Sequence, residues 1–209
     1  MENFAQLVYS LDQTTKTNKK IDLLVSFFSN ASNSDKLWCI ALFSGRRPKR
    51  LISTKYLRQW ACEETDLPTW LLEDTYSVVG DLAETISLLT QEKNQISTKS
   101  LTSWISELRQ LENEGLEEKR DFVTNAWSTL NRQERFVFNK LITGGFRLGV
   151  SQKLTIRALS KVTKIDQFEL SLRLMGNWHP DTISWNSLII NDERKSDISR
   201  PYPFCLAYG

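Results

Sequence analysis

Apolar residues recur at helical spacing along almost the whole chain, and this periodicity limits the fold more than any other feature. Residues 100–112 carry Leu101, Trp104, Ile105, Leu108 and Leu111 at spacings of three and four, which is typical of a helix with one buried face. Comparable patterns continue to about residue 177, with short connections and no strand-rich region. The sequence therefore predicts an all-α fold.

Capping and breaking residues predict where several helices begin and end. Ser34 and Asn131 precede helical patterns and are candidate N-caps, whereas Pro68 suits a first helical turn. Gly45 is placed to end the helix that begins near Ser34. Gly80 is expected to divide the helical segment that begins at Pro68.

Composition is typical of a globular protein, with 40% hydrophobic and 25% charged residues among 209. Cys39, Cys62 and Cys205 lack metal-site spacing, and the first two lie in apolar helical patterns, where they are expected to be core residues. The sequence shows no secretory signal and no apolar run long enough to span a membrane. We expect a cytoplasmic, nucleoid-associated protein.

Residues 140–154 read as a helix end, a glycine-rich basic turn and a new helix start. Glycine lets a backbone approach a ligand closely, and a helix N-terminus offers free amides and a partial positive charge to a phosphate. The candidate phosphate-binding residues here are Gly144, Gly145, Arg147, Gly149, Ser151 and Lys153. Such a turn can hold a nucleic-acid backbone without reading its bases.

Residues 45–58 repeat this pattern and contain no acidic residue. Their candidate DNA-binding residues are Arg46, Arg47, Lys49, Arg50, Ser53 and Lys55, with Ser53 as an expected N-cap. Two such turns in one chain suggest a pseudo-symmetric clamp on a duplex. The alternative is two solvated, basic helix starts.

Acidic residues gather between residues 59 and 92, where there is no lysine or arginine. This stretch offsets the basic turns, so a net charge of +2 is compatible with a basic face. The carboxylates lack a metal-binding pattern and are expected to form a solvated surface. They also provide the docking face in one alternative hypothesis, a helical protein-interaction scaffold.

Tryptophan and phenylalanine raise the possibility of base stacking. Core packing is the stronger prediction for the tryptophans within helical patterns, which are Trp38, Trp60, Trp70, Trp104 and Trp127. Trp178 and Trp185 lie in a less regular region and are expected to be more open. Phe146, within the glycine turn, is compatible with either a DNA contact or core packing.

Signs of catalysis are missing from the sequence. His179 is the single histidine, and no nucleophile signature, phosphate-binding loop or zinc motif accompanies it. We therefore expect no catalytic residue, metal or cofactor in this chain. A second alternative is a sequence-specific helix-turn-helix regulator over residues 155–174, although acidic Asp166 and Glu169 at the start of its second helix would repel phosphates.

Four segments together resemble the N-terminal region of bacterial ATP-dependent DNA ligases: residues 45–50, 80–86, 140–154 and 198–207. The resemblance implies a compact, all-helical DNA-binding domain that holds nicked duplex through minor-groove backbone contacts. A nucleotidyltransferase domain and an OB-fold domain would follow. It also implies a role in DNA repair, replication or recombination.

On this resemblance, residues 1–190 form the DNA-binding domain and residues 191–209 an extended linker towards the nucleotidyltransferase domain. The family's adenylated lysine lies in a K-x-D-G motif, which is absent; the nearest match, residues 164–167, lacks the glycine. We therefore expect this chain to lack ligase activity. ATP and magnesium would serve the parent ligase, and the partners would be nicked duplex DNA and the parent's catalytic domains.

Overall fold

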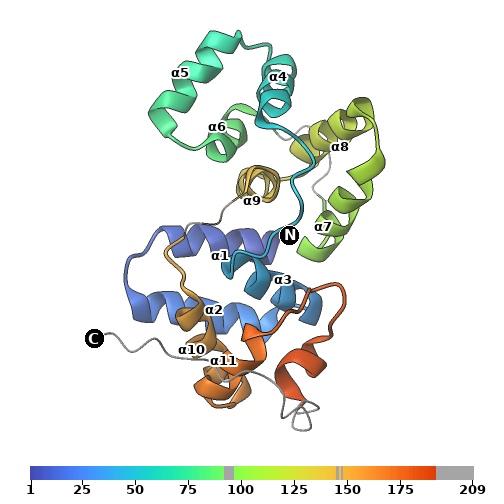
Figure 1. Ribbon diagram of the computed structural model, residues 1–209. Helices are drawn as coiled ribbons and strands as arrows, with labels where there is room; N and C mark the ends of the chain where they lie inside the picture. Colours follow the sequence, from blue (N-terminus) through green and yellow to red (C-terminus); the bar gives the residue numbers. More distant parts are fainter. Residues whose placement is uncertain (92–96, 145, 147, 192–209) are drawn as a thin grey trace, which may run out of the picture.

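The computed structural model describes residues 1–91, 97–144, 146 and 148–191, and every regular element among them is a helix (Figure 1). The helices form two groups. The first group contains α1 (Glu2–Asp12), α2 (Thr17–Asn30), α3 (Asn33–Phe43), α10 (Gln152–Thr163), α11 (Gln167–Met175) and the π-helical turn η2 (Asn186–Ile190). The second group contains α4 (Thr54–Thr65), α5 (Thr69–Val79), α6 (Leu82–Leu89), α7 (Leu101–Gln110), η1 (Leu111–Asn113), α8 (Leu116–Thr129) and α9 (Arg132–Thr143).

One hydrophobic core joins the two groups. Helix α9 lies between α1 and α6 and packs against both, while α3 contacts α7 (Figure 1). The buried apolar cluster includes Phe4 and Leu24 from the first group and Trp104 and Phe138 from the second. The all-α prediction is confirmed.

The chain passes between the groups at two places in the described residues. Residues 44–53, the first crossover, lead from α3 to α4, and residues 144–151, the second crossover, lead from α9 to α10. The two connections between the helix groups therefore lie within the two basic segments found in the sequence, apart from Ser44, which precedes the first segment.

Most predicted helix boundaries are confirmed. The Asn131 side chain accepts a hydrogen bond from the Glu134 amide at 3.1 Å, and Glu134 returns the interaction, which makes a capping box. Gly80, with φ +78°, separates α5 from α6. Ser34 is not the cap of α3; Ser32, two residues earlier, has the extended backbone that lets its hydroxyl accept from the Asp35 amide.

The burial of the tryptophans partly contradicts the sequence-based prediction. Trp38, Trp60, Trp104 and Trp127 are buried as expected. Trp70 is 68% exposed because α5 packs against α4 and α6 on one side and leaves the other side uncovered. Trp178 and Trp185, expected to be open, are buried instead: Arg46 stacks on the first and Phe28 contacts the second.

Helical structure extends beyond residue 177 through η2, which brings Leu188 and Ile189 into the core. Cys39 is fully buried, and burial raises the pKa of its thiol well above the usual value; Cys62 is half-buried against the core. Within the described residues, each helix is too short or too polar to cross a lipid bilayer. Cys205 and the expected linker, apart from Asn191, lie outside these residues, so the domain boundary stays a prediction.

Candidate nucleic-acid interface

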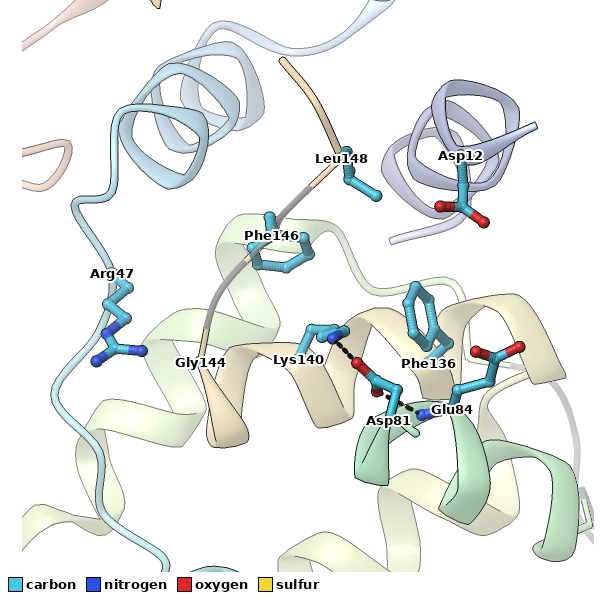
Figure 2. Close-up of a pocket in the computed structure, with 9 residues that line it drawn as sticks. All are labelled: Asp12, Arg47, Asp81, Glu84, Phe136, Lys140, Gly144, Phe146 and Leu148. Atoms are coloured by element: carbon cyan, nitrogen blue, oxygen red, sulfur yellow. Dashed lines mark hydrogen bonds and ion pairs between the residues drawn. The ribbon is translucent and has the colours of Figure 1, made fainter. Parts of the chain in front are cut away.

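The two crossovers approach each other at Arg47 and Gly144. Arg47 extends from the first crossover towards the second, where Gly144 ends α9 (Figure 2). A Cβ atom built on Gly144 would overlap the guanidinium group of Arg47. Arg47 is exposed and has no hydrogen-bond or ion-pair partner among the described residues. The fold thus brings the Arg47 guanidinium, which is unpaired within the described part of the chain, to the glycine at which the second crossover begins.

The second crossover depends on glycine for its backbone course. Gly144 has φ +89° and ψ 140°, a backbone conformation that residues with a Cβ rarely adopt. Its amide donates to the Lys140 carbonyl at 2.9 Å. Gly149 also has positive φ, at +60°. Gly145 and Arg147 lie outside the described residues, so their DNA contacts stay predictions.

Phe146 packs towards the interior rather than standing free at the surface. Its ring meets that of Phe4 edge-on at a centroid distance of 5.8 Å, and the side chain is half-buried against the hydrophobic core. Of the two interpretations that the sequence allowed, this geometry supports core packing. The aromatic ring attaches the second crossover to α1.

The start of α10 has the geometry expected of a phosphate-binding helix N-terminus. The Ser151 hydroxyl accepts a hydrogen bond from the Leu154 amide at 3.3 Å, which confirms Ser151 as the N-cap. Ser151, Gln152 and Lys153 are exposed. The Gln152 and Lys153 amides have no acceptor among the described residues, so they remain available to an anion.

Lys20, which was not among the residues predicted from the sequence, extends from α2 and binds the second crossover. Its ammonium group donates to the Leu148 carbonyl at 2.5 Å and to the Gly149 carbonyl at 3.4 Å, and the residue is only 8% exposed. It has no carboxylate partner among the described residues. Helical periodicity could have identified it, because Lys20 lies four residues before the buried Leu24. The contact leaves a buried positive charge next to the turn.

The Arg46 side chain forms hydrogen bonds within the protein. Its guanidinium donates to the carbonyls of Trp178 at 2.8 Å, Gly176 at 3.0 Å and Leu174 at 3.5 Å. It also lies 4.4 Å from the centre of the Trp178 ring. These carbonyls belong to the end of α11 and the residues after it, so Arg46 neutralises a negative helix terminus.

The other cations of the first crossover differ in how they are paired. Lys49 forms an ion pair with Glu112 at 2.5 Å, and this hydrogen bond lowers the pKa of the Glu112 carboxyl. Arg50 donates to the Ile52 carbonyl at 3.4 Å. Ser53 occupies the N-cap position of α4, but its side chain makes no capping hydrogen bond. Lys55 is exposed in the first turn of α4 and has no side-chain partner among the described residues.

A cavity of about 410 Å³ opens beside the crossovers. Arg47 and Gly144 lie at one end, and the carboxylates of Asp12 and Glu84 lie at the other (Figure 2). Between them Lys140 pairs with Asp81, whose other carboxylate oxygen accepts from the Glu84 amide. Since the carboxylate end repels phosphate, the crossover end is the side on which an anion would be favoured.

His179 lies in the loop that follows α11. Its ring meets Trp38 edge-on at 5.6 Å, and its Nδ1 lies 3.1 Å from an Asp181 carboxylate oxygen. Partial burial, together with the charges of Arg109 and Arg46, lowers the pKa of His179. These contacts describe a side chain that helps attach the loop after α11.

Comparison with known proteins supports the resemblance seen in the sequence. A search of curated proteins found no match. The family model described as DNA ligase N terminus matches residues 1–160, which include both crossovers and most of α10. The chain belongs to the family of N-terminal domains of ATP-dependent DNA ligases.

Proposed function

We propose that this domain binds duplex DNA, nicked duplex in particular, through sequence-independent minor-groove contacts to the phosphate backbone. The observation that carries the proposal is the convergence of the crossovers, where Arg47 from one meets Gly144 from the other. Segments that are almost 100 residues apart in the chain then act on one ligand. Membership of the ligase family supports a role next to DNA.

Three features of the crossovers suit a phosphate backbone. The exposed start of α10 supplies free amides and the positive end of a helix dipole. Lys153, Arg47 and Lys55 supply cations without internal partners among the described residues. Lys20 adds a buried positive charge close to the turn. Because these groups address phosphates, affinity should vary little with base sequence.

We propose further that the domain serves the catalytic domains of a parent ligase rather than acting alone. In that scheme ATP and magnesium belong to the parent's adenylation chemistry, and this chain holds the duplex on both sides of the break. The absence of a K-x-D-G motif from the sequence agrees with this division of work. We place the ligase in the bacterial cytoplasm, with the nucleoid.

Fluorescence anisotropy with labelled nicked, intact and single-stranded DNA of unrelated sequences, at two salt concentrations, tests the proposal. We expect salt-sensitive binding to every duplex, with each phosphate contact adding about one unit to the slope of log K against log salt. A strong preference for one sequence would favour a helix-turn-helix formed by α10 and α11. No binding at low salt would contradict a DNA-binding role for the isolated chain.

A further inference from the structure

Helix α5 lies at the outer edge of the second helix group (Figure 1) and carries exposed apolar side chains, as the exposed fractions of its residues show. Trp70 is 68% exposed and Val78 is 83% exposed. Asp74 and Ser77, also exposed, lie between them at helical spacing, so the four side chains share one side of the helix. We refer to Trp70, Asp74, Ser77 and Val78 as the α5 face.

Core formation does not account for the apolar residues of the α5 face. Leu72 is the one buried residue of α5. Among the described elements, the main packing contacts of α5 are with α4 and α6. The other six tryptophans of the chain are at most 7% exposed, which makes Trp70 an exception within this protein. Large apolar side chains left in water on one side of a helix are a feature of interaction surfaces.

The surroundings of the α5 face are acidic. Residues 59–91 contain no lysine or arginine. Arg120, Arg58 and Lys140, which lie outside this stretch, pair with Glu63, Glu73 and Asp81. Asp66 and Asp74 have no ion-pair partner among the described residues. The C-terminal end of α5, near Val78, adds the negative end of a helix dipole. The unpaired carboxylates make DNA and anionic lipid unfavourable occupants of this face.

We propose that the α5 face docks a partner protein through a cationic amphipathic helix. The apolar side of such a helix would cover Trp70 and Val78, and its lysine or arginine side chains would pair with Asp74 and the end of α5. Charge complementarity selects this occupant, because an acidic or neutral segment would leave Asp74 unpaired at the contact. The proposal does not depend on DNA binding at the crossovers.

The fluorescence of Trp70 can report whether a peptide occupies the α5 face. Since the other tryptophans are buried, quenching of the protein's fluorescence by acrylamide reports mainly on Trp70. The probe is a synthetic tryptophan-free peptide of leucine and lysine that forms an amphipathic helix, added to the whole chain. We expect a saturable blue shift and protection from acrylamide. A peptide of the same composition, scrambled to remove the apolar face, is the control and should give neither effect.

Two substitutions on the α5 face and one elsewhere separate specific docking from general attraction. Val78→Ser and Asp74→Lys should each weaken peptide binding at least about tenfold, because one removes apolar contact and the other reverses the local charge. Asp121→Lys makes the same charge change at an exposed position on α8 and should leave binding unchanged. Circular dichroism checks that the variants remain folded.

Three results would overturn the proposal. The first is no protection of Trp70 at any peptide concentration. The second is an equal loss of affinity in Asp74→Lys and Asp121→Lys, which would reduce the interaction to diffuse charge attraction. The third is a dimer, seen by sedimentation equilibrium and abolished by Val78→Ser, which would make a second copy of this chain the occupant.

Discussion

The two crossovers look alike in sequence but differ in how the fold uses them. In the first, Arg46 and Lys49 already have internal partners, and Ser53 does not cap its helix. In the second, Ser151 caps α10, and the Gln152 and Lys153 amides have no acceptor in the part of the chain that the structure describes. The first crossover therefore uses part of its charge to hold the fold, whereas the second leads into an exposed helix start with two amides that have no acceptor among the described residues.

This difference shows why a basic residue in a motif is not by itself a DNA contact. A guanidinium that satisfies three carbonyls would have to give up those hydrogen bonds before it could bind a phosphate. Arg47, its neighbour, carries the same charge without that cost. The comparison predicts that adjacent residues in the first crossover have separable roles.

Arg46→Ala should produce the largest loss of stability. Removing hydrogen bonds to the three carbonyls and the contact with Trp178 should lower the free energy of unfolding by about 2–4 kcal/mol, measured by urea denaturation. Arg47→Ala is the matched control: stability should change little, while affinity for every duplex falls. If Arg46→Ala and Arg47→Ala destabilised the protein equally, the assignment of Arg46 to stability and Arg47 to DNA binding would be wrong.

Gly144→Ala should be costly for a different reason. A Cβ would impose strain at φ +89° and displace the Arg47 guanidinium, so we expect a loss of about 1–3 kcal/mol in stability together with weaker DNA binding. Gly45→Ala tests the strain alone, because Gly45 has φ +79° but open space around its Cβ position. If Gly144→Ala bound DNA as tightly as Gly45→Ala, the contact between Arg47 and Gly144 would have no part in DNA binding.

Lys20→Met should loosen the second crossover and weaken DNA binding by about tenfold, since the carbonyls of Leu148 and Gly149 lose their donor. Hydrogen exchange should accelerate at the start of α10. The slope of log K against log salt should change less than for an exposed lysine, because the Lys20 amine is bound to carbonyls and acts on phosphate only from a distance. Lys19→Met, an exposed neighbour on α2, controls for the charge and should leave hydrogen exchange unchanged.

The smallest expected effect compares single surface cations. Lys153→Ala should reduce the slope of log K against log salt by about one unit, whereas Lys49→Ala should reduce it by less because Glu112 already neutralises that amine. Anisotropy titrations across a range of salt concentrations measure both slopes. A larger reduction in slope for Lys49→Ala than for Lys153→Ala would mean that the first crossover contributes more phosphate contacts than we assign to it.

Local signals in the sequence were sufficient for the helices and for many of their ends. The all-α fold, the Asn131 and Ser151 caps and the break at Gly80 follow from apolar spacing and from side chains that bond to nearby amides. The glycine turn was identifiable for the same reason. Such interactions involve residues within a few positions of one another, so the sequence alone specifies them.

Contacts between distant residues were decided only by the tertiary structure. The sequence could not show that Arg46 is taken up by carbonyls 128–132 residues away, that Lys20 reaches Leu148, or that the crossovers meet. It also gave the wrong exposure for Trp70, Trp178 and Trp185, because burial depends on which helix covers which. Amino-acid type determined where charge is available, whereas packing decided which charges remain free to meet a ligand.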